Sequence, residues 1–525
     1  MTGIAQYEFL VALIAIILVL EAFAHAWHLP QAAVLIVGGS ALALVPGMPQ
    51  IEPDPELVLA IFLPPLLMSG AFRTVWRDFR DNMAGILLLA VGAVGFTTLI
   101  VGLAVHYVLP SMPWAVCFAI GAVVSPPDAV AADAVLARVR LPSRIIALLQ
   151  GESLLNDAAG LVLLRFAIAA ALTGTFSLTQ ALEQFSILSV GGVVLGYALG
   201  QGGRIVVRRL PESRHAIAAT VLITAIAYVG AERLHFSGVL ATVTAGLTLG
   251  WHQHRDFSAT LRVRAFAFWD VLVFIMESLL FILIGLSLRG VINHVTSVED
   301  ALHTLLLPAA TVVAATVVAR FIWVFASDIV LRVMQAIGLR HHSAPSFAAA
   351  TVMGWAGMRG VVTLLAALSL PETLPGRDVA LVSAFGIIVA SVLVQGSTLG
   401  ALIRWLRLDS AEEARAQREA EAHAWVSMAD AQYAAIARMG AEHPRLMEQY
   451  RYRAMMAAEA RDAPDASRTH EIAHFAALLA AISAGRGTIL HLHRAGRIPD
   501  TVLREMEYEL DLQQMVAEAR LAEPG

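Results

Sequence analysis

The sequence contains no lysine and a single cysteine, Cys117, and only 15% of its 525 residues are charged. One cysteine excludes an internal disulfide and any cysteine-based zinc or iron–sulfur site. A chain without lysine cannot carry the G-x-x-x-x-G-K-[ST] loop, so ATP-driven pumping of the P-loop type is excluded. The net charge of −5 argues against a nucleic-acid partner. No motif requires a cofactor, and we expect none.

Apolar residues are abundant instead. They make up 58% of the chain, and the mean hydropathy is +0.71. The charged fraction is well below the roughly 25% of soluble domains. These values predict an all-α polytopic membrane protein and exclude a typical soluble enzyme or a disordered chain.

The composition changes near residue 408. Residues 1–408 hold 23 arginines and 22 acids, whereas residues 409–525 hold 13 arginines and 19 acids. We therefore expect a transmembrane domain at 1–408 and a helical tail at 409–525. The first apolar stretch, Phe9–Leu20, lacks a basic leader and a cleavage site, so it is interpreted as a membrane helix and not a signal peptide.

Thirteen segments are candidates to cross a bilayer, whose apolar core needs about 20 helical residues. They lie at 7–25, 30–46, 56–71, 84–108, 113–136, 146–172, 184–203, 215–232, 236–250, 266–288, 303–331, 346–369 and 379–403. With the N-terminus outside, the cytoplasmic loops hold fifteen arginines and the opposite loops hold three. This bias follows the positive-inside rule and predicts a cytoplasmic tail.

The densest group of intramembrane polar residues begins in the fifth span. Ser125-Pro126-Pro127-Asp128 places two consecutive prolines in that span. The prolines remove two backbone donors and predict a broken helix with Asp128 at the break. Broken helices at membrane depth line cavities or are buried, and in transporters they form ion sites. The alternative is a simple proline kink.

The sixth span adds four polar side chains. Glu152 and Asn156 share one helix face, and Ser153 and Asp157 share the adjoining one, because each pair is four residues apart. Oxygen ligands of this kind suit a hard cation such as Na⁺. A single acid that holds either a cation or a proton is the minimum requirement for exchange. If 151–157 were instead a cytoplasmic loop, these groups would be ordinary solvated side chains.

Two later arginines need partners inside the membrane. Arg359 lies in the glycine-interrupted segment 354–363, which predicts a second broken helix. A buried arginine requires a carboxylate, and we expect Glu152 to pair with it; the alternative is that Arg359 snorkels to an interface. Arg320 in the eleventh span is a possible modulator. Arg165 could snorkel or pair and receives no role.

At these residues the chain resembles the bacterial sodium/proton antiporters of the monovalent cation:proton antiporter family, relatives of the animal sodium/proton exchangers. The matching segments run in family order through most of the membrane domain. They are Leu63–Leu67, Ser125–Ala132, Gly151–Asp157, Ser237–Ala241, Phe281–Gly285 and Gly357–Gly360.

The resemblance implies thirteen spans in two inverted six-helix repeats, a dimerisation domain that would make the chain a homodimer in membrane lipid, and a mobile core crossed by two broken helices. It implies that Asp157 carries the exchanged ion or proton, and that Asp128, Ser153 and the carbonyl of Pro127 assist. Glu152 and Arg359 would form a structural ion pair. The Asn156-Asp157 pair is associated in the superfamily with electroneutral exchange.

Three residues depart from the family pattern. Pro127 stands where threonine is usual, Ser69 replaces a glutamate common in archaeal relatives, and Glu277 stands where many relatives have asparagine. The missing hydroxyl and the extra acid leave Na⁺ and K⁺ open as the cation, and Glu277 is a possible modulator of stoichiometry.

The tail carries one other pattern, His470-Glu471-Ile472-Ala473-His474. Two histidines four apart beside a glutamate are typical of zinc peptidases. No third-ligand motif follows, although His491 and His493 are nearby, and the segment also fits an amphipathic helix. The sequence thus favours a Na⁺/H⁺ antiporter, not an enzyme, that accepts Li⁺ and lies in the bacterial inner membrane. The alternatives are a K⁺/H⁺ antiporter and a membrane-bound zinc peptidase.

Overall fold

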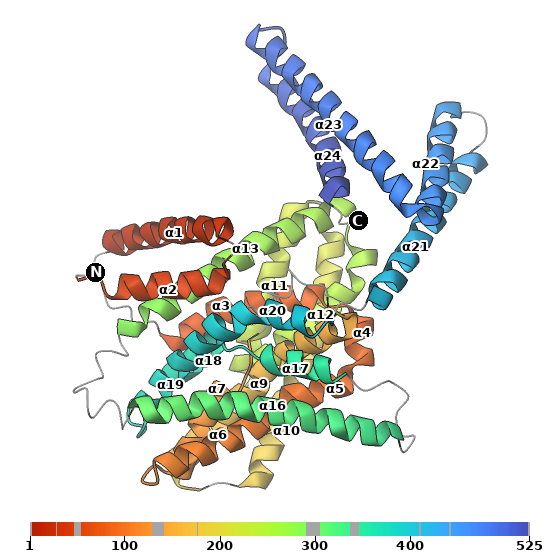
Figure 1. Cartoon of the computed structure of the whole chain (residues 1–525). Helices are drawn as coiled ribbons and strands as arrows, with labels where there is room; N and C mark the ends of the chain where they lie inside the picture. The colour runs from red at the N-terminus through yellow and green to blue at the C-terminus, as the bar shows by residue number, and fades with distance from the viewer. Residues whose placement is uncertain are drawn as a thin grey trace. The chain divides into compact units, whose positions relative to one another are not determined.

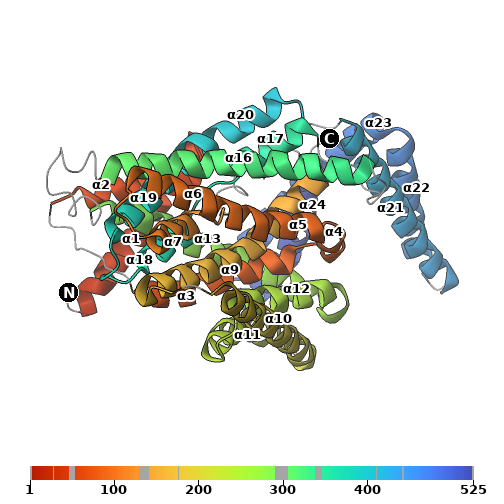
Figure 2. The same ribbon diagram turned by 90° about the horizontal axis from the view of Figure 1, so that it is seen from below.

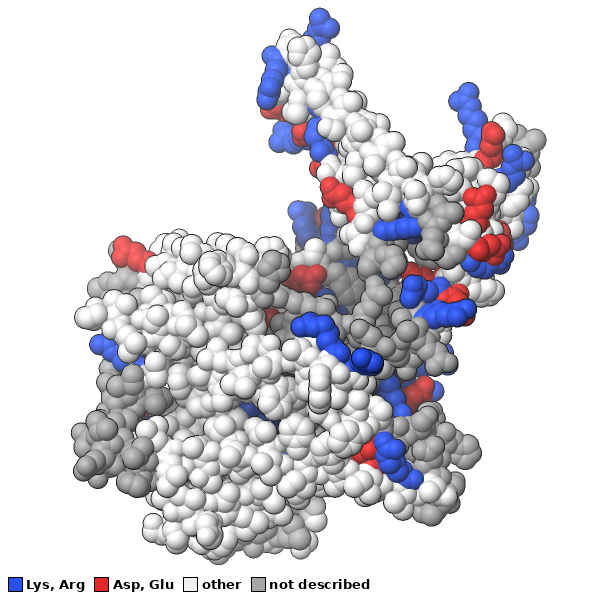
Figure 3. All heavy atoms as spheres, viewed as in Figure 1, with Lys and Arg blue, Asp and Glu red and all other residues white. Residues whose placement is uncertain are grey.

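A computed structural model describes residues 3–27, 29–46, 54–128, 141–175, 177–289, 305–336, 346–408, 411–439 and 443–522. The chain divides into two compact units, Met1–Asp409 and Ser410–Gly525. The described residues of both units form helices joined by short non-helical segments, and they contain no strand. Charged side chains are sparse over the visible surface of the first unit and frequent on the second (Figure 3).

The first unit contains short and long helices in chain order (Figure 1). Their bounds are α1 Gly3–Ala26, α2 Gln31–Ala43, α3 Pro55–Arg73, α4 Trp76–Asp81, α5 Met83–Leu87, η1 Leu88–Ala93, α6 Val94–Val108, α7 Trp114–Val124, α9 Ser143–Thr173, α10 Leu178–Arg209, α11 Ser213–Arg233, α12 Gly238–Asp256, α13 Ala259–Leu286, α16 Leu307–Ala336, α17 Phe347–Trp355, α18 Val361–Leu368, α19 Arg377–Ala390, η3 Ser391–Gly396 and α20 Ser397–Trp405. The η segments are single π-helical stretches that continue into α-helix.

Ten helices of the described chain are long and apolar enough to cross a membrane. Nine coincide with expected spans. The other four expected spans correspond to α2, α7, α12 and the pair α17–α18, which are shorter, more polar or broken. The tenth apolar helix, Arg468–Arg494, lies in the segment that the sequence assigned to the tail.

Helix ends follow local sequence signals. Serine side chains accept a hydrogen bond from the first turn of α12, α13 and α17, at Ser237, Ser258 and Ser346. Such caps satisfy amide groups that have no partner within the helix. Gly174 ends α9 with a φ of 70°, a conformation that glycine adopts at little steric cost.

Packing divides the first unit into two helix groups. The group called the scaffold here contains α1, α2, α3 and α10–α13, and the group called the site group contains α5–α7, α9 and α16–α20 with η1 and η3. Figure 2 shows α10, α11 and α12 together at one edge and α16, α17 and α20 at the opposite edge. Helices α9 and α18 of the site group also pack on the scaffold, α9 through α12 and α3, and α18 through α3 and α13.

The second unit consists of α21 Ala411–Arg438, α22 Pro444–Asp462, α23 Pro464–Arg494 and α24 Asp500–Ala522. Each helix packs on the next. An ion pair of 2.6 Å between Arg486 and Asp511 joins α23 to α24, and the Arg520 guanidinium lies 4.0 Å from the centre of the Trp425 ring.

Candidate functional site

The expected fifth span is interrupted where the two prolines fall. Helix α7 ends at Val124, and Ser125, Pro126 and Pro127 follow it in a non-helical, buried segment. Helix α9 approaches this break closely, because a Cβ atom on Gly160 would collide with the ring of Pro126. The rest of the expected span, 129–136, lies outside the described residues.

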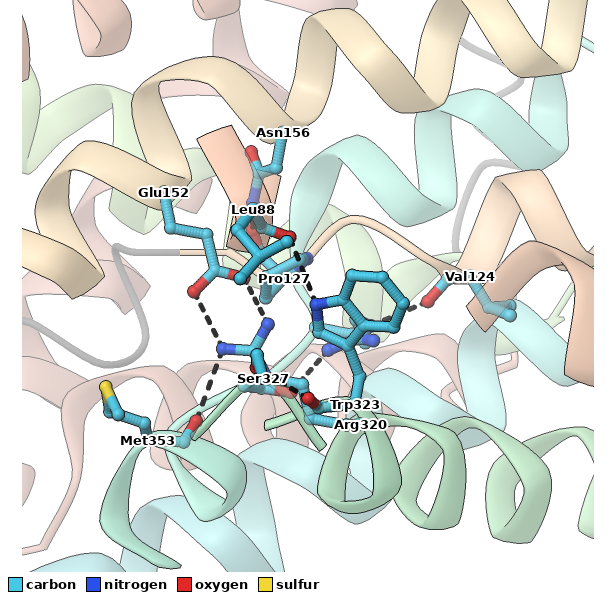
Figure 4. Close-up of polar contacts among 11 residues, drawn as sticks. Leu88, Val124, Pro127, Glu152, Asn156, Arg320, Trp323, Ser327 and Met353 are labelled. Carbon is cyan, nitrogen blue, oxygen red and sulfur yellow. Dashed lines mark hydrogen bonds and ion pairs between the residues drawn. The ribbon is translucent and has the colours of Figure 1, made fainter. Parts of the chain in front are cut away.

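Asn156 connects α9 to the break. Its Nδ2 donates a hydrogen bond to the carbonyl oxygen of Pro127 (Figure 4), whereas its buried Oδ1 has no partner. The neighbouring Asp157 is only 7% exposed, and its carboxylate forms no hydrogen bond or ion pair with the described part of the chain. Asp128 is close enough to interact with it electrostatically. A buried carboxylate without a partner among the described residues therefore lies beside the free amide oxygen of Asn156 and near the carbonyl oxygen of Pro127.

The twelfth expected span is also broken. Helix α17 ends at Trp355 and α18 begins at Val361, as the glycines predicted. Asp128 reaches across from the first break, where its Oδ2 accepts a hydrogen bond of 3.2 Å from the Val361 amide and its own amide donates to the Met358 carbonyl at 2.7 Å. A carboxylate at the start of α18 is favourable because that end carries partial positive charge.

Arg359 has the complementary position. Its Nε donates at 2.6 Å to the carbonyl of Val124, the last residue of α7, and its Nη1 donates to the Gly357 carbonyl. Its backbone amide donates to the Ser391 hydroxyl at 3.0 Å. A cation at a helix C-terminus is favourable for the same electrostatic reason. The two breaks therefore stabilise each other. Asp128 of the first break lies at the start of α18, and Arg359 of the second break lies at the end of α7.

Glu152 pairs with Arg320 and not with Arg359, so the expected Glu152–Arg359 pair was wrong. Arg320 holds both carboxylate oxygens of Glu152, with Nη2 at 2.7 Å from Oε2, and it also donates to the Met353 carbonyl at 3.2 Å (Figure 4). Both side chains of the pair are at most 3% exposed. The sequence argument failed because a buried arginine can be satisfied by helix-end carbonyls as well as by a carboxylate.

The remaining expected site residues are more scattered. Ser153 lies half-buried on α9, and Glu277 lies half-buried on α13 of the scaffold. His470 and His474 are exposed on α23. In the described ranges, no group of three or more histidine, cysteine or acidic side chains could hold a metal ion.

Two polar contacts were not anticipated from the sequence. Ser391, in the π-helical segment η3, binds the backbone of Arg359, and the Trp323 indole donates at 3.0 Å to the Leu88 carbonyl in η1 (Figure 4). A π-helical turn leaves backbone groups without their usual partners, which explains why side chains bind there. A serine or tryptophan in an apolar run gives little warning of this role.

The arrangement suits reversible binding of a small cation or a proton. Carboxylate, amide and carbonyl oxygens are ligands for hard cations. The same carboxylate can take up a proton instead.

A family model described as "Sodium/hydrogen exchanger, transmembrane" matches residues 9–405. The chain belongs to the sodium/hydrogen exchanger family. This exchanger is therefore a multi-span membrane transporter, a cation/proton antiporter by family, and not an enzyme.

Similar proteins span most of its length. An uncharacterised Na⁺/H⁺ exchanger of Mycobacterium tuberculosis is 29% identical, over 96% of this chain and 95% of the relative. A sodium, potassium, lithium and rubidium/H⁺ antiporter of Bacillus pumilus is 32% identical, over 68% of this chain and 55% of the relative. The solved structure of the sodium proton antiporter MjNhaP1 from Methanocaldococcus jannaschii covers 78% of this chain and all of that one, with a TM-score of 0.61 and 21% identity. The exchanger shares that fold.

Proposed function

We propose that this exchanger moves a monovalent cation, with Na⁺ preferred and Li⁺ accepted, against H⁺ by alternating access, and that the two ions compete for Asp157. The observation that carries this proposal is the carboxylate of Asp157, which is buried at the first break and lacks a polar partner among the described residues. A buried carboxylate of this kind needs a counter-ion or a proton.

The neighbouring groups complete the proposed site. The free Oδ1 of Asn156 and the carbonyl of Pro127 supply neutral oxygens, and Asp128 and Ser153 lie on the same two elements. Asp128 is engaged at the start of α18, so we assign it a positioning role with a possible second contact to the ion. The proposed sequence is cation release, protonation of Asp157 and reorientation of the site group against the scaffold.

The identity of the cation has a second candidate. Pro127 supplies no side-chain hydroxyl, and a ligand set with one oxygen fewer is less selective for the smaller ion. The Bacillus pumilus relative is named for potassium and rubidium as well as sodium and lithium. K⁺/H⁺ exchange at the same carboxylate is therefore the alternative.

The proposed setting follows the arginine distribution. We place the exchanger in the bacterial inner membrane, with the N-terminus outside and a membrane domain at 1–408 of thirteen spans in two inverted repeats. The tail at 409–525 would be cytoplasmic. The protein would form a homodimer within the lipid bilayer. One-for-one exchange at a single carboxylate would be electroneutral.

The test is exchange by the purified full chain in proteoliposomes, followed with a pH-sensitive dye while Na⁺, Li⁺ and K⁺ are compared. We expect Asp157→Asn to abolish exchange and to remain monodisperse, because asparagine has the same shape but cannot exchange a proton. The wild-type Michaelis constant should rise as the pH falls, by at most about tenfold per pH unit, since one proton competes with one cation. Wild-type exchange rates in Asp157→Asn, or a Michaelis constant for the cation that does not change with pH, would refute competition of the two ions at Asp157.

A further inference from the structure

Arg165 and Glu232 form an ion pair that the exchange site described above does not use. The Arg165 Nη2 lies 2.8 Å from the Glu232 Oε2, and the two side chains are 53% and 31% exposed. Arg165 belongs to α9 in the site group, and Glu232 belongs to α11 in the scaffold. The ion pair therefore joins a helix of the site group to a helix of the scaffold.

Glu232 is fixed to the scaffold by its second oxygen. Its Oε1 accepts a hydrogen bond of 3.1 Å from the amide of Gly238, at the start of α12. The preceding residue, Ser237, caps α12 and donates its own amide to the Leu188 carbonyl of α10 at 3.0 Å. The carboxylate is thereby held where α10, α11 and α12 meet, and its other oxygen, Oε2, binds Arg165 of the site group.

The pair also lies near the proposed exchange site. Arg165 is two helical turns beyond Asp157 on α9, a distance of about 12 Å along the helix. In the proposed orientation, α9 runs from the cytoplasm outward, so the pair lies on the external side of Asp157.

A charge-assisted hydrogen bond of this length tolerates little movement, because its energy falls steeply once the heavy atoms separate. Alternating access moves the site group relative to the scaffold. A bond that joins these groups on one side of the ion site can therefore exist in only one of the two end states.

We propose that Arg165 and Glu232 form a latch that holds the exchanger closed on the external side and breaks when the site opens outward. This inference rests on the alternating-access mechanism proposed above. The latch sets the balance between the two states, and so it sets the cation affinity measured from each side. A ligand or contact shifts such a balance only through the difference it makes between the states.

The test compares sided transport by the full chain in right-side-out and everted membrane vesicles. In Arg165→Gln and in Glu232→Gln, the Na⁺ concentration for half-maximal exchange should fall on the external side and rise on the cytoplasmic side. The expected change is about two- to fivefold, the range that partly exposed ion pairs support. Arg165→Lys, and the charge-exchanged Arg165→Glu with Glu232→Arg, should restore values close to wild type.

Arg73→Gln is the matched control. Arg73 and Asp270 form a similar half-exposed pair, but both belong to the scaffold, on α3 and α13. That variant should leave both affinities unchanged. The latch proposal is refuted if Arg165→Gln and Glu232→Gln have wild-type Na⁺ affinities on both sides, or if they weaken transport equally on both sides. If Asp157→Asn still exchanges, it is the proposed exchange site that fails, whatever the Arg165 variants show.

Discussion

The buried pair between Glu152 and Arg320 gives the sharpest test of how the site group is held together. Arg320, on α16, binds both oxygens of Glu152 on α9 and also the Met353 carbonyl at the end of α17. Removing one partner leaves the other as an uncompensated buried charge, which typically costs about 3–5 kcal/mol. Glu152→Gln and Arg320→Gln should each destabilise the protein by this amount.

The expected shift in melting temperature follows from the size of the unit. Unfolding entropy is about 2.1 cal/mol/K per residue, and the helices belong to the compact unit Met1–Asp409. A loss of 3–5 kcal/mol then lowers the melting temperature by about 4–6 °C. The double variant should be less destabilised than the sum of the singles, by about 1–3 kcal/mol, because neither charge is left alone.

The assay is thermal unfolding of the purified, detergent-solubilised chain, for the two singles, the double variant and a second cycle that combines Glu152→Gln with Arg359→Gln. Arg359 donates to carbonyls and forms no ion pair with Glu152, so the second cycle should show much weaker coupling. Strict additivity for Glu152 with Arg320, or stronger coupling of Glu152 with Arg359, would refute the pairing described here.

Two further outcomes test the rest of the site. Gly360→Ala should abolish exchange in a folded protein, because the added Cβ would displace the Asp128 carboxylate from the start of α18. Gly95→Ala is the control and should transport normally, because nothing lies within 4 Å of its added carbon. Normal exchange in Gly360→Ala would argue against a role for the contact between Asp128 and α18. In proteoliposomes clamped with potassium and valinomycin, exchange at a fixed pH gradient should not depend on the imposed potential, and a voltage dependence that disappears in Glu277→Asn would reject electroneutral exchange.

The sequence predicted those parts of the site whose signals are local. The prolines at 126 and 127 remove backbone donors, and α7 ends before them, although Pro64 and Pro65 lie within the continuous helix α3. Polar residues four apart share a face of any helix. Helix α7, the gap between α17 and α18, and the cluster on α9 were therefore found before the fold was known. Nine of the expected spans also appear among the long apolar helices, because length and hydropathy are sufficient to identify them.

The partners of the charged residues could not be predicted in the same way. Whether Glu152 meets Arg320 or Arg359 depends on the rotation of α16 about its axis and on where the two broken segments cross. Hydrophobic periodicity would indicate the rotation of a helix, but it is weak in helices that are apolar on every side. Carbonyl ligands for Arg359 appear only once α7 is known to end at Val124 beside it. The same reasoning applies to Arg165, whose partner on α11 is set by how α9 packs against the scaffold.

The corrected pairing strengthens the argument for Asp157. Arg320 neutralises Glu152, Asp128 lies at the positive end of α18, and Arg359 lies at the negative end of α7. Each of these charged side chains has a fixed electrostatic partner, so none of them is available to bind a cation and a proton in turn. Within the described part of this cluster, Asp157 is left as the acid whose charge nothing compensates. If the site must be neutral whenever it reorients, the proposed mechanism needs one uncompensated acid. That acid binds a cation when the site moves in one direction and a proton when it moves in the other.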